Sequence, residues 1–540
     1  MVSQLYLLWI LTYTCLGSWF ILHLMMFKKG FLLNLIFLLI FSWSLLPKIP
    51  NQSFIVELSL KLFLPAMTLN LILYCFISPQ TSKSSLKKYR AILRLESGYL
   101  ALENIRRGIS IIGAAGSGKT ESVVHSLLKH FRKHSFSGLL HDYKNFELTE
   151  MAYPLFKTGK LPFYIISFDT IYHRVNPIAP RYMVDEESVN EVSRVLLENL
   201  LEQKEFMASG TVRFFNDAVE GLIGGMIWKL KTDYPKFCTL PHLIALYQSM
   251  ETEELVSFLS TNITSRAMAD AFISGIASER QTAAVKSSLA NALKKICTQR
   301  IFMALSKDEV PLDINNPENP AVVSIVNNPK YETAYSPVIA TTIHTITKQM
   351  STRNREGSFL LMEEAPTLRL LHMHRVPATL RSYNISTIYV MQDKIQNDLL
   401  YGEKASKAIL SNLSYQFFGK VNDPDTAQYY EKFFEIIQKE NISIHQGGNL
   451  DFDTRITKSH KEGTKIRFDT FFRLNAGEFV SFADGKEKRI KFPQPVFQKE
   501  LPEKFNGYSD KDIRENFERI YQEVQSEILK KLKLSSGARA

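Results

Sequence analysis

Cysteine is scarce in this chain and is never arranged for metal or disulfide chemistry. Only four cysteines occur among 540 residues, and no two are spaced as Cys-x-x-Cys. No histidine stands near them at metal-ligand spacing, so the sequence provides neither a zinc site nor a disulfide framework. We expect all four to be ordinary apolar residues in a reducing compartment: Cys15, Cys75, Cys238 and Cys297.

Long apolar runs are absent beyond about residue 80, as are internal repeats and long low-complexity tracts. The chain is long enough for two or three domains with real cores. Its net charge of +11 suits an anionic partner such as nucleic acid or inner-leaflet lipid. The alternative is that part of this excess only flanks a membrane segment. No aromatic platform for stacking single-stranded nucleic acid is evident.

The N-terminal 80 residues have the composition of a membrane anchor. Residues 5–27 carry no charged side chain and are long enough to cross a bilayer. Lys28 and Lys29 follow this run and no basic residue precedes it, which favours a retained anchor over a secretory signal. A second apolar run covers 31–46, and a third, at about 54–77, contains Glu57 and Lys61.

Basic residues set the predicted orientation of this anchor. Three spans with the N-terminus outside would place Lys28, Lys29 and the basic cluster at residues 83–94 in the cytoplasm. The alternative has two spans, with the third run lying at the interface. We therefore predict a multi-pass membrane protein, with residues 1–80 as anchor and the remainder in the cytoplasm.

A phosphate-binding loop follows a buried-strand pattern at residues 108–112. The pattern G-x-x-x-x-G-K-[ST] stands here in the context that it needs, between a strand and a helix. Glycines let backbone N–H groups approach phosphate oxygens, and the helix N-terminus adds its positive dipole end. We predict that ATP is bound by Gly113, Ala114, Ala115, Gly116, Ser117, Gly118, Lys119, Thr120 and Glu121.

Two side chains of this loop have predicted roles. Lys119 would reach the β- and γ-phosphates, and the Thr120 hydroxyl would ligate Mg²⁺. A chance glycine turn is the alternative, and the flanking strand and helix disfavour it.

The best candidate for the carboxylates of such a site lies far downstream. The apolar run 358–362 predicts a central parallel strand, and Glu363 and Glu364 follow it directly. We expect Glu363 to hold Mg²⁺ through water and Glu364 to orient the attacking water. In P-loop ATPases the first of the two acidic residues after this strand is usually Asp. Because Glu363 stands there instead, the sequence leaves open which glutamate touches the metal. A pair of solvated acids at a strand end is the alternative.

Further strands predict one α/β doubly wound sheet of the RecA-like P-loop NTPase class. They lie at 138–144, 163–168, 321–326, 385–391, 415–420 and 477–483, where the folded part is expected to end. Helix-like spacing covers about 335–352. Gln392, at the tip of the 385–391 strand, is expected to sense the γ-phosphate, or else to be a polar strand cap.

Helical spacing replaces the strand pattern between residues 183 and 312. We predict an all-α insert there, with a helix starting at Ser278, between two parts of the nucleotide-binding domain at 81–182 and 313–500. Residues 501–540 predict a charged amphipathic helix and tail that docks a partner or packs on its own domain. Its apolar face comprises Ile513, Phe517, Ile520, Val524, Ile528 and Leu532.

This layout resembles the type IV coupling proteins of bacterial conjugation, the TraG/TraD group, and is most similar to shorter TraG/MobC-like members from Bacteroidetes elements. The resemblance covers most of residues 85–485. It rests on the anchor, the P-loop, the Asp142-Tyr143-Lys144 strand end, the insert, the acid pair and Gln392. The sequence departs from the family where Glu363 replaces Asp, and where Asn145-Phe146 replaces the glycine often found after the Asp-x-Lys strand end.

The resemblance implies a homo-hexameric ring tethered to the inner membrane. Such rings bring relaxase-bound DNA to the channel components of a type IV secretion system and use ATP to drive DNA transfer. In these rings an arginine reaches the phosphates bound by a neighbouring subunit. Counting back along the chain from Gln392, Arg381 matches the position of that arginine. A surface arginine on a helix is the alternative. A motor for protein substrates alone, and a nucleotide-binding scaffold with little hydrolysis, remain alternative functions.

Overall fold

The structure is a computed structural model that describes residues 87–201, 210–446, 454–494, 496–503 and 507–537. The three predicted membrane runs lie outside these residues. Within the described part of the chain, no helix combines the length and the apolar character needed to cross a bilayer. Residues from Lys88 onward form one unit.

Nine strands form one mixed sheet in the order β13-β12-β9-β3-β8-β7-β4-β6-β5. The seven strands from β9 to β5 are parallel, and β12 and β13 continue the sheet antiparallel. The bounds of the nine are β3 Ile109–Ile112, β4 Ser137–Asp142, β5 Phe163–Ile166, β6 Val322–Val326, β7 Ser358–Met362, β8 Ile385–Met391, β9 Tyr415–Phe418, β12 Glu478–Ala483 and β13 Lys486–Lys491.

Apolar side chains project from both faces of the sheet into packed cores, as a doubly wound fold requires. On β7, Phe359 and Leu361 pack into one core cluster, whereas Leu360 and Met362 pack into the other. Helices α6 (His125–Lys133) and α7 (Glu147–Phe156) cover the first face. Helix α16 (Glu332–Met350) contributes to the cluster on the second face. The predicted doubly wound α/β sheet is therefore confirmed.

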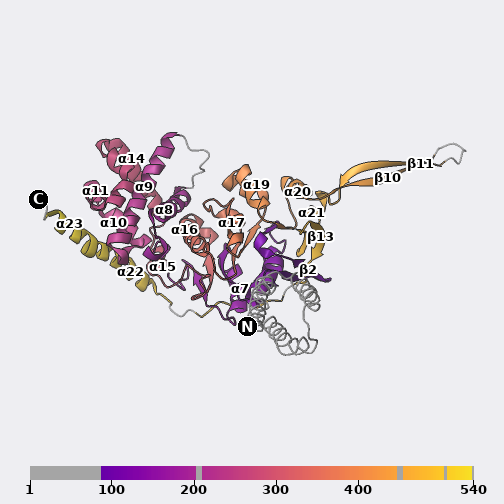
Figure 1. The fold of residues 1–540 in the computed structure, drawn as a ribbon, viewed down its shortest axis with the longest axis horizontal. Coiled ribbons are helices and arrows are strands. Elements are labelled where there is room, and N and C mark those ends of the chain that lie inside the picture. The colour runs from indigo at the N-terminus through magenta and orange to yellow at the C-terminus, as the bar shows by residue number, and fades with distance from the viewer. Residues whose placement is uncertain (1–86, 202–209, 447–453, 495, 504–506, 538–540) are drawn as a thin grey trace, which may run out of the picture. The chain divides into compact units, whose positions relative to one another are not determined.

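Between β5 and β6 the described residues contain helices and no strand. Figure 1 shows α9, α10, α11 and α14 side by side in this region. Helix α14 begins after Ser278, as predicted, because the Ser278 side chain accepts a hydrogen bond from the Gln281 backbone N–H. The helices are α8 Glu186–Leu201, α9 Gly210–Asp233, α10 Leu240–Ser249, α11 Thr252–Ser260, α12 Ile263–Met268, α13 Asp270–Ser274, α14 Glu279–Lys294 and α15 Gln299–Ala304.

The C-terminal helix packs on the helices between β5 and β6, which is the second of the two expected arrangements. It comprises α22 (Asp510–Glu523), a wider helical stretch at Val524–Leu529, and α23 (Lys530–Gly537). The rings of Phe517 and Phe302 of α15 lie 4.7 Å apart. His242 of α10 and Glu523 approach to 3.0 Å between Nε2 and Oε2.

Several elements were not predicted. The folded part does not end near Ala483, because β13 adds an edge strand whose sequence, Lys-Glu-Lys-Arg-Ile-Lys, carries almost no apolar pattern. Charged edge strands of this kind protect a sheet from pairing with other chains. Two separate hairpins, β1 with β2 and β10 with β11, were also missed. Their bounds are β1 Ala91–Arg94, β2 Tyr99–Leu102, β10 Ile436–Gln446 and β11 Thr454–Thr464.

The remaining helices lie in the second half of the sheet domain. Helix α17 precedes β8, α18 and α19 follow it, and α20 and α21 flank the β10–β11 hairpin in sequence. Their bounds are α17 Val376–Ser382, α18 Lys394–Tyr401, α19 Glu403–Ser411, α20 Pro424–Glu431 and α21 Asp469–Phe472.

Candidate nucleotide-binding site

The loop after β3 has a backbone that only glycine adopts without cost. Gly116 and Gly118 have φ angles of +74° and +83°, in the left-handed region that other residues avoid. A Cβ at Gly118 would lie 2.8 Å from the backbone N of Gly477. A Cβ at Gly113 would lie 2.8 Å from Ser117 Oγ. The loop is therefore packed tightly against Gly477 and, between Gly113 and Ser117, against itself.

Backbone hydrogen bonds fix this loop between the strands that flank β3. Gly113 N–H donates to Met391 O of β8 at 3.2 Å, and Ala114 N–H donates to Lys420 O after β9 at 2.7 Å. Gly477 N–H donates to Ser117 O at 3.0 Å. The loop continues into a helix that begins at Thr120 and runs on as α6, so the helix N-terminus faces the loop, as a phosphate site requires.

Lys119 folds back into this loop. Its ammonium group donates to the carbonyl oxygen of Gly113 and to that of Ala114, the latter at 3.3 Å. The side chain is buried, and burial lowers the pKa of Lys119, although the nearby charges of Glu364 and Glu363 oppose that shift. A buried ammonium group beside a glycine loop is the arrangement that grips phosphate.

The loop and the predicted acid strand meet at one hydrogen bond. The Thr120 hydroxyl donates to Glu363 Oε1 at 3.0 Å, across 243 positions of sequence. Glu363 is buried, and its Oε2 has no hydrogen-bond partner among the described residues. Burial, and then the charge of Asp142, raise the pKa of Glu363 well above its ordinary value. The site thus holds an acidic oxygen that lacks a compensating partner.

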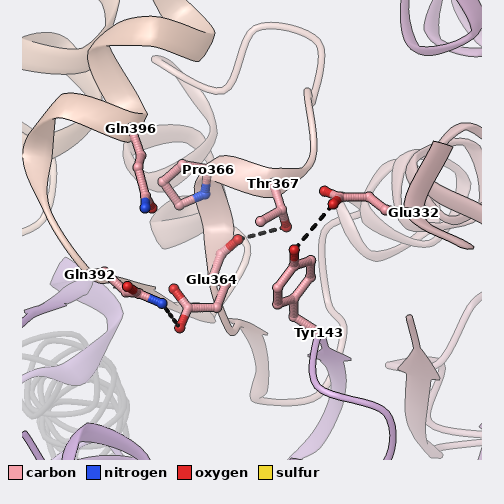
Figure 2. A pocket seen from close by; sticks show the side chains of 7 residues that line it. All are labelled: Tyr143, Glu332, Glu364, Pro366, Thr367, Gln392 and Gln396. Carbon is pink, nitrogen blue, oxygen red and sulfur yellow. Dashed lines mark hydrogen bonds between the residues drawn. The ribbon is translucent and has the colours of Figure 1, made fainter. Parts of the chain in front are cut away.

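Glu364 has an unusual backbone conformation, with φ 45° and ψ 51°. Left-handed backbone costs a non-glycine residue on the order of 1–3 kcal/mol and concentrates at functional sites. The carbonyl oxygen of Glu364 accepts hydrogen bonds from the Thr367 hydroxyl at 2.7 Å and from the Thr367 backbone N–H at 3.0 Å. Its carboxylate Oε1 accepts a hydrogen bond from Gln392 Nε2 at 3.0 Å (Figure 2).

A pocket of about 250 Å³ lies against Glu364 and Gln392. Figure 2 shows Glu364 between Gln392 on one side and Tyr143, Thr367 and Glu332 on the other. The pocket is also lined by Pro366 and Gln396. It has room for water beside the carboxylate that was predicted to orient the attacking water.

The strand end Asp142-Tyr143-Lys144 joins the acid pair. The Lys144 ammonium lies 3.3 Å from Glu364 Oε1 and 4.0 Å from Glu363 Oε1. Burial alone would lower the pKa of Lys144, but the charges of Glu363, Glu364 and Glu147 together raise it. Asp142 is fully buried and accepts hydrogen bonds from the Thr149 hydroxyl at 2.6 Å and backbone N–H at 2.7 Å.

Two predicted site residues outside the loop lie on the surface. Arg381, in the last turn of α17, is exposed. Glu121, at the start of the helix that follows the loop, is also exposed. Every other predicted residue lies in the loop or at the adjoining ends of β7 and β8, so the structure brings one group together from three strands.

Sequence reasoning gave no role to Lys144, Tyr143 or Thr367. The available signal for Lys144 was its position at the end of the predicted parallel strand 138–144, because the carboxyl ends of such strands share one edge. Thr367 carried no signal, since its contact depends on the left-handed turn at Glu364.

ATP and Mg²⁺ fit the residues of this site. An added Cβ at Gly113 or Gly118 would collide with Ser117 or Gly477, so the backbone of the phosphate loop requires glycine there, and Glu363 Oε2 is an acceptor without a donor among the described residues. Among the described residues no group of three His, Cys, Asp or Glu side chains stands at metal-binding distance. Mg²⁺ is commonly held by one or two protein oxygens together with phosphates and waters, and Thr120 and Glu363 provide such oxygens.

Comparisons with known proteins agree with this fold. No curated protein matches the chain by sequence. The structure of the bacterial conjugative coupling protein TrwBdeltaN70 superposes with a TM-score of 0.61 at 12% identity, covering 78% of this chain and 94% of that one. TrwB in complex with ADP and Mg²⁺ superposes with a TM-score of 0.57 at 12% identity, covering 74% and 88%. TrwB with the ATP analogue ADPNP gives 0.58 at 12% identity, covering 75% and 89%.

The fold and the glycine-rich loop from Gly113 to Thr120 are those of the P-loop NTPase class. Within that class, residues 358–436 match the family described as the TraM recognition site of TraD and TraG. The matched segment begins with β7 and includes the acid pair, Arg381 and Gln392. The resemblance of this chain to type IV coupling proteins of the TraG/TraD type is therefore confirmed.

Proposed function

We propose that this protein is a membrane-anchored ATPase that couples ATP hydrolysis to the transfer of relaxase-bound DNA into a type IV secretion channel. The observation that carries the proposal is the 3.0 Å hydrogen bond between Thr120 and Glu363. It joins the phosphate loop to the acid strand, so that both halves of an ATPase site lie together. The TraG/TraD likeness supports conjugation as the setting.

In the proposed reaction each residue has one task. Lys119 and the loop N–H groups bind the β- and γ-phosphates, while Thr120 and Glu363 hold Mg²⁺, which supplies positive charge to the phosphate oxygens. Glu364 accepts a hydrogen bond from the attacking water and orients it. Gln392 fixes the Glu364 carboxylate through the 3.0 Å hydrogen bond. Burial of both glutamates strengthens these electrostatic interactions.

The assembly is proposed on the family likeness together with the exposure of Arg381. In a homo-hexamer, Arg381 would reach the phosphates bound by a neighbouring subunit and stabilise the charge of the transition state. Replacement by alanine is expected to abolish turnover while nucleotide binding persists. Partners of the assembly would be the relaxase, a TraM-like protein, channel components and inner-membrane lipid. The anchor at residues 1–80 would place the ATPase domain in the cytoplasm.

The test is steady-state ATP turnover by the full-length protein in detergent with phospholipid and Mg²⁺, with and without DNA. Wild type is expected to hydrolyse ATP faster with DNA. Lys119→Ala is expected to lose nucleotide binding, and Glu364→Gln to bind nucleotide but hydrolyse it at only a small residual rate. Equal, negligible rates in all three proteins would contradict an ATPase and favour a scaffold. If DNA does not stimulate ATP turnover, and the protein does not bind DNA even at low salt, protein cargo would be favoured.

A further inference from the structure

Lys144 is in ion-pair contact with both members of the acid pair. Its ammonium lies 3.3 Å from Glu364 Oε1 and 4.0 Å from Glu363 Oε1. The two glutamate side chains are only 3% and 2% exposed, whereas Lys144 remains 35% exposed. The cation therefore approaches two buried carboxylates from the solvent side of the site.

Two donors converge on the same oxygen of Glu364. Gln392 donates to Oε1 at 3.0 Å, and Lys144 contacts this same atom. No hydrogen bond to Oε2 of Glu364 occurs within the described part of the chain, and the 250 Å³ pocket borders this residue. The carboxylate is thus fixed through one oxygen, and its second oxygen is left as an acceptor.

The turn that presents Lys144 is strained. Asn145 and Phe146 both have left-handed backbone, with φ angles of 49° and 76°. This conformation is uncommon for Asn and a genuine outlier for a bulky residue such as Phe. Such strain persists only where the surroundings over-determine it, and it clusters at active sites.

Three hydrogen bonds fix this turn. The Lys144 backbone N–H donates to Asp142 Oδ1 at 3.1 Å, and the Asn145 N–H donates to Asn327 O at 3.1 Å. The Tyr143 hydroxyl donates to Glu332 Oε2 at 3.1 Å (Figure 2). The turn is therefore anchored to β4, to the end of β6 and to the start of α16.

We propose that Lys144 is a positioning residue for the reaction at Glu364. It holds Oε1 together with Gln392, so that Oε2 points to a single place where a water molecule is accepted. The strained turn after β4 exists to deliver this ammonium group. The proposal rests on the ATPase function proposed above and adds to it a residue that acts through Glu364, not directly on the nucleotide or the attacking water.

The experiment compares Lys144→Gln, Lys144→Arg and Lys157→Gln in full-length protein with Mg-ATP. Lys157 is a matched control, because its side chain is 34% exposed and pairs with Glu500 away from the site. Lys144→Gln is expected to lower kcat by about 10- to 100-fold, the usual effect of losing a group that orients a reacting ligand. The Kd for ADPNP should change by less than about twofold. Lys144→Arg should restore most of kcat, and Lys157→Gln should leave it unchanged.

A double-mutant cycle separates positioning from general damage. Lys144→Gln should cause no further loss of residual turnover when Glu364 is already Gln, because the two side chains act as one unit. Full additivity in that background would overturn the proposal, and so would a kcat in Lys144→Gln equal to that of wild type. An inactive wild type would overturn the ATPase function and this proposal together, whereas an active wild type unaffected by Lys144→Gln would overturn the positioning role alone.

Discussion

Gly118→Ala should destabilise the protein more than Gly116→Ala, although the two glycines share a left-handed backbone. At Gly116 an added Cβ would have no neighbour within 4 Å. Its cost is the backbone strain of about 1–2 kcal/mol, offset by about 0.4–1 kcal/mol because alanine restricts the unfolded chain. At Gly118 the same Cβ would lie 2.8 Å from Gly477 N. Overpacking against backbone adds about 1–3 kcal/mol.

The expected losses of unfolding free energy are therefore about 1 kcal/mol for Gly116→Ala and about 3 kcal/mol for Gly118→Ala. Urea unfolding without nucleotide, followed by tryptophan fluorescence and circular dichroism, measures both as shifts of the midpoint at an unchanged slope. Gly118→Ala should also weaken the loop contact between Ser117 and Gly477. Equal losses in the two variants, or a larger loss in Gly116→Ala, would refute the steric reasoning.

Three further predictions follow from the buried polar groups. Stability to urea should fall by several kcal/mol between pH 6.5 and pH 4, with each pKa unit contributing about 1.4 kcal/mol, because the lowered pKa values of three buried histidines outweigh the raised pKa of Glu363. Unfolded histidine binds a proton below pH 6.5, whereas burial lowers three pKa values to about 4 in the folded protein, those of His125, His130 and His141. A pH-independent unfolding free energy in this window would contradict this. Thr149→Val should cost about 2 kcal/mol, because buried Asp142 loses the hydroxyl at 2.6 Å. If Thr149→Val unfolds at the same urea midpoint as wild type, the hydrogen bond from Thr149 to Asp142 contributes nothing to stability. Thr120→Val should raise the Mg²⁺ concentration needed for ADPNP binding, measured by calorimetric titration, while unaltered Mg²⁺ dependence would exclude Thr120 as a ligand.

Much of the parallel sheet could be predicted from sequence, because buried parallel strands are continuous apolar runs. The runs that end at Ile112, Met362 and Met391 are of this kind, and the structure places all three at the centre of the sheet. The glycine spacing likewise identified the phosphate-binding loop, since only glycine readily adopts the left-handed backbone found at Gly116 and Gly118. Local sequence therefore predicted the elements that carry the site.

The side-chain contacts between these elements were harder to predict from the sequence. That Glu363 meets Thr120 while Glu364 meets Lys144 and Gln392 depends on the left-handed turn at Glu364, and no local pattern marks glutamate for that conformation. The edge strand β13 and the hairpins were missed because charged or short strands lack an apolar signature. The domain boundaries at residues 182 and 312 and the roles of the individual site residues stay predictions.

The most direct test of the account is an experimental structure of the full-length protein with ADPNP and Mg²⁺. We expect the triphosphate over the loop from Gly113 to Thr120, Mg²⁺ beside Thr120 and Glu363, and the γ-phosphate between Lys119 and Glu364. A nucleotide bound elsewhere, or one bound at the loop with both glutamates turned away from its γ-phosphate, would contradict the claim that these two segments form one ATPase site.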